Sequence, residues 1–158
     1  FVSSAPMDGR RGAMPFKTMT HYMGGWMMPL LEKIGGRFMV PTRPFKEAYF
    51  LEDALKFREA LNMPLCYIGG LISREKIDEV LDKGFEFVAM ARALVNEPGF
   101  VNRMMADEKA RSACDHSNYC IGRMYTIDMA CHKCLLAQGE KIPQSLLDEL
   151  EKNKRKGY

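Results

Sequence analysis

The chain has 158 residues, of which 47% are hydrophobic and 27% charged, and its net charge is +3 at neutral pH. This composition is typical of one globular domain with a buried core, and it excludes collagen-like, mucin-like and wholly disordered chains. The charged residues are spread along the chain, apart from a basic cluster at residues 152–156. That distribution predicts a solvated tail and no nucleic-acid partner.

The first third of the chain gives weak structural signals. It begins at Phe1 without an initiator Met, so we expect the natural product to extend upstream. Residues 1–15 combine Gly, Pro and two adjacent Arg, which predicts a loop. Residues 18–34 are rich in Met, and we expect them to pack on their own domain, with a cofactor or a second subunit as the alternative contact. The nearly uncharged stretch 18–31 is too short to cross a bilayer and lacks a signal-peptide pattern, so we expect a cytoplasmic protein without a membrane partner.

Residues 45–61 carry the first regular pattern. Four apolar residues recur there at helical spacing, namely Leu51, Ala54, Leu55 and Leu61. Asn62 and Pro64 predict the end of this helix. Residues 64–68 then form a continuous apolar run stopped by Gly69-Gly70, which is typical of a parallel strand buried on both faces. We expect Cys66, in the middle of this run, to be a small buried hydrophobe.

A second helix and a second strand follow with short connections. Ser73 is a good N-cap, and Gly84 suits the end of a helix. The inward positions of this helix are Ile77, Val80 and Leu81. Residues 85–91 form another buried apolar run, and a further helix starts at Arg92. The order helix, strand, helix, strand, helix is typical of β/α units on a parallel sheet.

The character of the chain changes after Arg111. Four cysteines stand on predicted loops, namely Cys114, Cys120, Cys131 and Cys134. A charged helix is predicted over residues 145–154. We therefore divide the chain into a β/α part, residues 1–106, and a Cys-containing appendage, residues 107–158. Thiols in an intracellular chain suggest metal or iron–sulfur ligation more readily than disulfides, with inert or redox-sensitive thiols as the alternative.

The two strand ends are the candidate binding site. Gly69-Gly70 follows one strand and Ala91-Arg92 follows the next. The carboxyl ends of strands face the ligand in β/α folds, where glycines let the backbone approach a phosphate and a guanidinium adds a charge-assisted contact. Taken alone, the same residues also fit a tight turn and a surface helix.

Three stretches carry a resemblance to a known family: Phe45–Ala54, Tyr67–Gly70 and Phe87–Pro98. They resemble the C-terminal part of the NADH:flavin oxidoreductase family, that of Old Yellow Enzyme and the dienoyl-CoA reductases. Phe1-Val2-Ser3 is similar to the loop after that family's sixth strand, and Cys114–Cys131 to its tail, so the resemblance spans most of residues 1–134.

The resemblance implies an α/β fold, here the C-terminal portion of a TIM (β/α)8 barrel with a Cys-containing C-terminal appendage, and FMN as cofactor. The FMN phosphate would lie between the loops after the last two strands. Its contacts would be Gly69, Gly70, Ala91 and Arg92. The family usually has Gly where this chain has Ala91, whose extra methyl group crowds a closely approaching phosphate.

The family's reaction is that of a flavin-dependent ene-reductase: a hydride passes from NAD(P)H through FMN to the β-carbon of an activated alkene. The resemblance thus implies a small-molecule substrate, a missing N-terminal half of the barrel, and a homo-oligomer as a possibility for the full-length form. In that family the loops after the first four strands bind the flavin ring and supply the proton donor, and those loops are absent here. We therefore expect this chain alone to be inactive. Two alternatives remain: a cysteine-ligated metal or interaction module, and a partner subunit that pairs with a separate half-barrel.

The cysteines differ from the pattern of family members that hold a [4Fe–4S] cluster. Those members have two residues between the first and second Cys, and here Ser117 stands at the second position, with Cys131 as the fourth. We predict no cluster, because a thiolate ligand is lost. Cys134 or His116 would be substitute ligands for zinc in a mixed site.

The other polar and aromatic candidates have simpler interpretations. His21 and His132 show no nucleophile or carboxylate partner in the sequence, so we expect solvent-facing or structural roles. Tyr119 and Tyr125 are expected to cover the barrel.

Overall fold

The computed structural model describes residues 15–23, 44–124 and 128–154. They belong to two compact units. The β/α unit is Lys46–Cys114, and the helical unit joins the described parts of Phe1–Phe45 and Asp115–Tyr158. The predicted loop at the N-terminus up to residue 14, the segment 24–34 and Tyr125 lie outside the described residues. The sequence predicts a boundary after residue 106, between the barrel part and the appendage of a parent protein, and this boundary stays a prediction.

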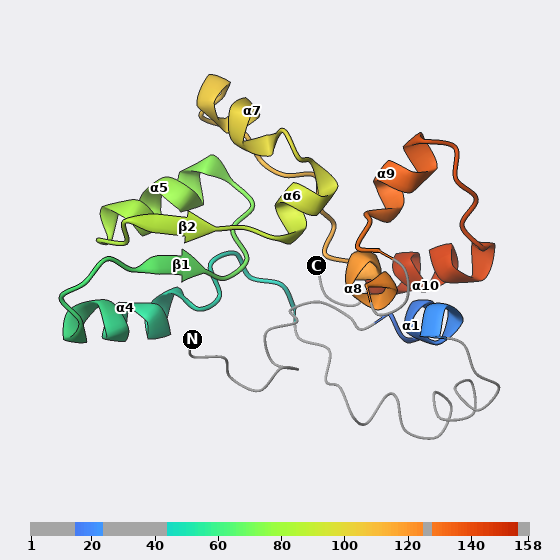
Figure 1. Cartoon of the computed structure of the whole chain (residues 1–158), viewed down its shortest axis with the longest axis horizontal. Helices are drawn as coiled ribbons and strands as arrows, with labels where there is room; N and C mark the ends of the chain where they lie inside the picture. Colours follow the sequence, from blue (N-terminus) through green and yellow to red (C-terminus); the bar gives the residue numbers. More distant parts are fainter. Residues whose placement is uncertain (1–14, 24–43, 125–127, 155–158) are drawn as a thin grey trace. The chain divides into compact units, whose positions relative to one another are not determined.

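The β/α unit follows the predicted order of elements. Its helices and strands are α4 (Leu51–Ala60), β1 (Cys66–Ile68), α5 (Arg74–Asp82), β2 (Phe87–Ala89), α6 (Arg92–Asn96) and α7 (Phe100–Ala106). The two strands lie side by side and parallel (Figure 1), with Cys66 opposite Phe87 and Ile68 opposite Ala89. The connection from β1 to β2 runs through α5, as a parallel pair requires. The eight-stranded barrel stays a prediction, because the described residues contain these two strands alone.

Local capping sets the limits of α5 as the sequence predicts. Ser73 has an extended backbone, and its hydroxyl accepts a hydrogen bond from the Lys76 backbone N–H at 3.3 Å. At the other end Gly84 adopts φ +93°, a conformation that costs glycine nothing and strains other residues. Between these ends, Ile77 and Val80 are buried.

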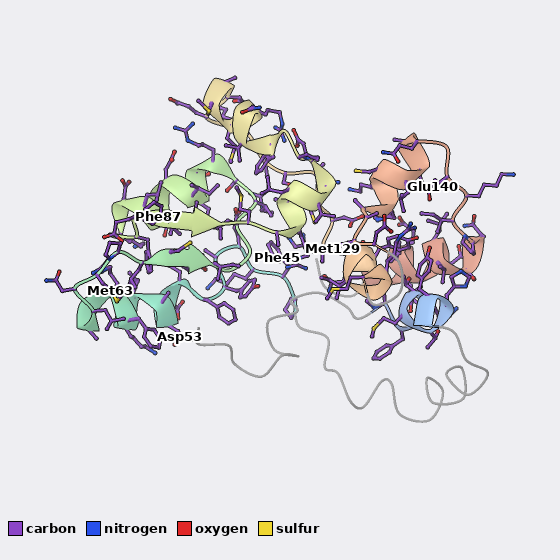
Figure 2. The ribbon with its side chains drawn as sticks, viewed as in Figure 1. Phe45, Asp53, Met63, Phe87, Met129 and Glu140 are labelled. Atoms are coloured by element: carbon purple, nitrogen blue, oxygen red, sulfur yellow. The ribbon has the colours of Figure 1, made fainter. Side chains whose placement is uncertain are left out.

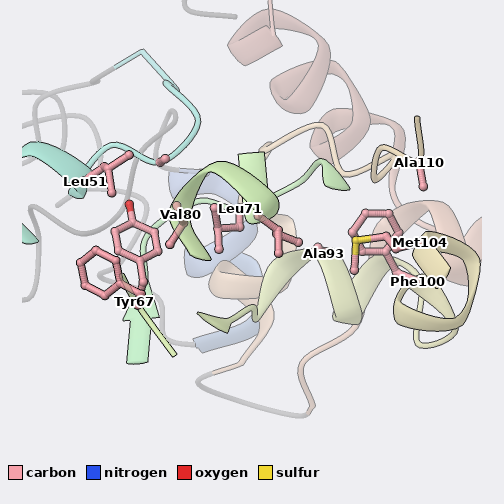
Figure 3. Packing of buried hydrophobic residues seen from close by; sticks show 11 residues of the cluster. Leu51, Tyr67, Leu71, Val80, Ala93, Phe100, Met104 and Ala110 are labelled. Carbon is pink, nitrogen blue, oxygen red and sulfur yellow. The ribbon is translucent and has the colours of Figure 1, made fainter. Parts of the chain in front are cut away.

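The core of the β/α unit lies between the strands and their helices. Tyr67 of β1 is only 2% exposed, and Val80 of α5 and Phe100 of α7 are completely buried (Figure 3). Burying one such side chain contributes about 1.5–3 kcal/mol. The buried members of this cluster are Ala48, Leu51, Tyr67, Leu71, Ile77, Val80, Phe85, Ala93, Phe100, Met104 and Ala110.

The prediction that both strand faces are buried is wrong for this chain. Successive residues of a strand point to opposite faces, so Tyr67 enters the core while its neighbours Cys66 and Ile68 are exposed. Phe87, which pairs with Cys66 and is labelled in Figure 2, is 61% exposed. Cys66 is therefore not the buried hydrophobe that the sequence suggests. We call Cys66, Ile68 and Phe87 the open face of the sheet.

Two helix positions also differ from the prediction. Leu61 and Leu81 are 39% and 38% exposed, although their spacing matches the buried stripes. Leu61 follows the last residue of α4 and has an extended backbone, so the helical period no longer sets its direction. Leu81 directly follows Val80, which takes the inward position, and adjacent helical residues do not share a face.

The helical unit consists of α1 (Phe16–Met23), α8 (Tyr119–Arg123), α9 (His132–Ala137) and α10 (Gln144–Lys154). The predicted C-terminal helix is confirmed as α10. Glu149 of α10 caps α1, because its carboxylate accepts hydrogen bonds from the backbone N–H groups of Lys17 at 2.8 Å and Thr18 at 3.1 Å. A carboxylate at this end also complements the helix dipole. Throughout the described ranges, no helix is both long and apolar enough to cross a bilayer.

Candidate functional site

The parallel register brings the two predicted site segments to one edge of the sheet. β1 ends at Ile68 and β2 ends opposite it at Ala89. Gly69-Gly70 and Ala91-Arg92 therefore leave the sheet at the same edge, where ligands bind in β/α folds. The phosphate contacts themselves stay a prediction.

Packing explains why residue 69 is glycine. A Cβ atom added there would lie 2.6 Å from the hydroxyl oxygen of Tyr67 and 3.0 Å from its Cζ. The Gly69 carbonyl also accepts a hydrogen bond from that hydroxyl at 3.1 Å. Gly70 adopts φ +72°, a region that favours glycine. These two glycines thus meet demands of the fold, and they are also suited to a close phosphate.

Ala91 and Arg92 form the start of α6. Ala91 is exposed, and its carbonyl accepts the hydrogen bond from Val95 N at 3.0 Å. Arg92 is the first residue of the helix and is half-buried. The edge therefore combines a cationic side chain with glycine backbone, a donor set that fits the phosphate of FMN in charge and chemistry.

The structure shows a hollow elsewhere in the β/α unit. An open depression runs along α5, lined by Glu75, Asp78, Glu79, Asp82, Lys83 and Glu108. Its carboxylates would repel a phosphate. This depression therefore does not compete with the strand ends as the candidate site.

The sequence predicts that all four cysteines lie on loops, and this prediction is wrong for two of them. Cys114 lies in an irregular segment and Cys131 directly precedes α9, but Cys120 is buried in α8 and Cys134 belongs to α9. Among the residues that the structure describes, no three His, Cys, Asp or Glu side chains converge as a metal site would require. Cys114, Ser117 and Cys131, which stand at the family's cluster-ligand positions, all lie within the described ranges.

A cluster of polar side chains that the sequence did not reveal surrounds Asp115 in the helical unit. His132 is 6% exposed, and its Nε2 lies 3.4 Å from Asp115 Oδ2. Lys133 Nζ lies 3.6 Å from the same oxygen, and the Ser117 backbone N–H donates to Asp115 Oδ1 at 3.1 Å. Burial alone would raise the pKa of Asp115, but His132, Ser117 and Lys133 together hold it below its usual value. The carboxylate partner of His132 is therefore Asp115, 17 positions earlier in the chain, and this contact agrees with a structural role for His132.

The tyrosine at the start of α8 packs inside the helical unit. Tyr119 is 1% exposed, and its hydroxyl hydrogen-bonds that of Tyr22 at 2.6 Å. Burial raises the pKa of Tyr119 above its ordinary value, and the hydrogen bond to Tyr22 adds to the rise. Arg123 lies over the Tyr22 ring at 5.4 Å and pairs with Asp128 at 2.7 Å. Within this unit Tyr119 has a packing role, and covering of the barrel stays a prediction.

The comparison with known proteins finds one curated relative. No family model matches the chain, and no solved structure matches it significantly. A 4,4'-dithiodibutanoate disulfide reductase of Rhodococcus erythropolis is 46% identical over 94 residues, which cover 60% of this chain and 23% of the relative. The chain thus spans less than a quarter of that protein's length. Over this segment it is similar to part of an oxidoreductase.

Proposed function

We propose that this chain is the C-terminal portion of an FMN-dependent NAD(P)H oxidoreductase and supplies the FMN-phosphate site. The observation that carries the proposal is the parallel register of β1 and β2, which delivers Gly69-Gly70 and Ala91-Arg92 to one sheet edge. Similarity to a segment of a disulfide reductase supports the oxidoreductase class.

Each part of the edge would have a distinct role. The Arg92 guanidinium would neutralise the phosphate charge, and the backbone at Gly70 would approach the phosphate without a side chain in the way. FMN, when bound, would accept a hydride from NAD(P)H and pass the electron pair to the substrate. Tyr67 would act indirectly, because its hydroxyl fixes the Gly69 carbonyl and thereby the course of the loop.

The open face of the sheet supports a barrel as the parent fold. Cys66, Ile68 and Phe87 present apolar surface that no described residue covers sufficiently to bury it. Exposed apolar surface of this kind is typical of a site against which another part of a protein packs. In a TIM barrel these positions would point to the interior, where layers of side chains from alternate strands fill the space. We infer that the rest of the parent protein covers the open face.

The relative and the family resemblance suggest different substrates. The relative's name specifies a disulfide reductase, which favours an organic disulfide: RSSR, NAD(P)H and H⁺ would give two RSH and NAD(P)⁺. The family resemblance favours an activated alkene instead. Turnover of NAD(P)H by the full-length parent with 4,4'-dithiodibutanoate, compared with an enone, separates the two. The present chain alone should support neither reaction, and flavin-dependent turnover by it would contradict the role assigned here.

The test of the phosphate site is an FMN titration of the purified chain, followed by flavin fluorescence. Arg92→Ala should raise the Kd for FMN by about 10- to 100-fold, because a hydrogen bond to a charged group contributes about 1.5–3 kcal/mol. Lys56→Ala is the matched control, since it removes an exposed cation from α4, and it should leave the Kd unchanged. Riboflavin, which has no phosphate, should bind wild type and Arg92→Ala equally. An unchanged Kd for Arg92→Ala, or a chain that binds neither FMN nor phosphate, would refute the proposal.

A further inference from the structure

One carboxylate ties the loop after β1 to the turn before α4. The loop is residues 69–73, and the turn is residues 47–50. Glu47 Oε1 accepts hydrogen bonds from the Ile72 backbone N–H at 2.9 Å, the Ser73 backbone N–H at 2.7 Å and the Ser73 hydroxyl at 2.8 Å. The Glu47 side chain is only 11% exposed. Three donors on a largely buried carboxylate oxygen make a strong, charge-assisted anchor for the loop.

The other oxygen of this carboxylate is paired with a cation. Glu47 Oε2 lies 3.1 Å from Arg111 Nη1. The segment that carries Arg111 also contacts the loop, because the Ser112 backbone N–H donates to the Ile72 carbonyl at 2.7 Å. The Arg111 guanidinium balances the charge of Glu47. A phosphate at this edge of the sheet would therefore meet a neutralised carboxylate, which repels it less than a free one.

The turn before α4 contacts the glycine part of the loop as well. The Ala48 backbone N–H donates to the Gly70 carbonyl at 3.5 Å, and the Phe50 N–H donates to the Tyr67 hydroxyl at 3.3 Å. Ala48 is buried and adopts φ +52°, a conformation that is costly for a residue with a Cβ atom. Such a conformation persists only where the surrounding contacts hold it. The hydrogen bonds of Glu47, the preceding residue, are the shortest of these contacts.

We propose that Glu47 is a positioning residue, which fixes the loop 69–73 in the conformation that receives the FMN phosphate. The inference rests on the proposed function, since that function makes this segment the phosphate loop. Glu47 occupies the backbone N–H groups of Ile72 and Ser73, just before α5. The phosphate would therefore take its backbone donors from the glycines that precede them, with Arg92 as the cation. A loop that is already fixed loses less conformational entropy when the phosphate binds.

The first measurement is amide hydrogen exchange of the full chain by NMR, without ligand. Glu47→Ala should accelerate exchange at Ile72 and Ser73 by about 10- to 100-fold, because each amide loses a hydrogen bond to a charged group. The Val80 amide, within α5, should remain slower than both, which shows that the unit stays folded. Glu47→Gln should fall between wild type and Glu47→Ala, because its amide oxygen still accepts hydrogen bonds.

The second measurement is the binding of FMN and riboflavin, followed by flavin fluorescence. Glu47→Ala should raise the Kd for FMN at least about threefold, because the apparent affinity falls with the fraction of molecules whose loop is in the binding conformation. Riboflavin, which lacks the phosphate, should bind wild type and Glu47→Ala equally, whereas a general loss of structure would weaken both ligands. Glu52→Ala is the matched control. It removes a carboxylate of α4 that is 90% exposed, and it should change neither exchange nor binding.

Unchanged exchange at Ile72 and Ser73 in Glu47→Ala, or equal acceleration in Glu52→Ala, would overturn the proposal. So would a loosened loop that leaves the Kd for FMN at its wild-type value. If Glu47→Ala fails to fold, Glu47→Gln gives the same readouts, and wild-type exchange and binding in that variant would also overturn it. A wild-type chain that binds neither FMN nor phosphate refutes the proposed function instead. The exchange rates, which are measured without ligand, then still decide whether Glu47 holds the loop.

Discussion

The contact between Gly69 and Tyr67 gives the sharpest test of how the candidate site is built. Gly69→Ala would place a Cβ atom 2.6 Å from the Tyr67 hydroxyl oxygen. Tyr67 is 2% exposed, so its ring cannot swing into solvent. Overpacking of this kind costs about 1–3 kcal/mol of unfolding free energy. Gly99→Ala is the matched control, because an added Cβ there meets nothing within 4 Å, and it should change stability by less than about 0.5 kcal/mol.

Tyr67→Phe probes the same contact from the other side. The hydroxyl accepts a hydrogen bond from Phe50 N at 3.3 Å and donates one to the Gly69 carbonyl at 3.1 Å. Its removal leaves both backbone groups without this partner, at a cost of about 1–3 kcal/mol. The double variant combines Gly69→Ala with Tyr67→Phe, so the hydroxyl oxygen that the added Cβ atom would meet is absent. The two hydrogen bonds of that hydroxyl are lost only once. The double variant should therefore cost about 1 kcal/mol less than the sum of the single variants.

The assay is urea unfolding of the full chain followed by far-UV circular dichroism. Because the chain has two compact units, hydrogen exchange of the α5 amides gives a second readout that belongs to the β/α unit. A difference of 1 kcal/mol is about a fivefold change in the ratio of folded to unfolded molecules. Additivity of the two substitutions within about 0.3 kcal/mol, or a Gly69→Ala variant as stable as wild type, would refute the reasoning.

This contact also affects how binding experiments are interpreted. A loss of FMN binding in Gly69→Ala would follow from disturbed packing, whatever the role of the glycine in holding phosphate. Arg92→Ala is the more specific probe, because Arg92 is only half-buried and does not belong to the core cluster.

Two further predictions concern stability. Ser73→Ala should lower the unfolding free energy in urea by about 1–2 kcal/mol, because it removes the cap of α5 and the hydroxyl that donates to Glu47 at 2.8 Å. Ser145→Ala, at an exposed helical position, is the control and should leave the unfolding free energy unchanged. Equal effects of the two substitutions would contradict this reasoning. The second concerns pH. Asp115 has a lowered pKa in the folded state, so its stabilising contribution is present above the unfolded pKa of about 4 and is lost as pH falls through the lower folded value. Asp115→Asn should flatten the acid limb of a stability–pH curve measured by thermal unfolding, and an unchanged limb would refute the assignment.

Local signals determined the order of elements in the β/α unit. The cap at Ser73 and the positive φ of Gly84 depend on residues close in sequence, so the limits of α5 could be predicted. The same holds for the strand ends, because two parallel strands in one sheet place Gly69-Gly70 and Ala91-Arg92 at the same edge. That part of the candidate site followed from the sequence.

The tertiary structure alone decided which faces are covered and which distant residues meet. The apolar run 64–68 did not indicate that Tyr67 enters the core while Cys66 is exposed, because strand alternation fixes opposite directions but not the side on which helices pack. The capping of α1 by Glu149 joins residues more than 130 positions apart, and Asp115 meets His132 through the packing of α9. Such contacts depend on the path of the whole chain, whereas periodicity and capping report only on neighbouring residues.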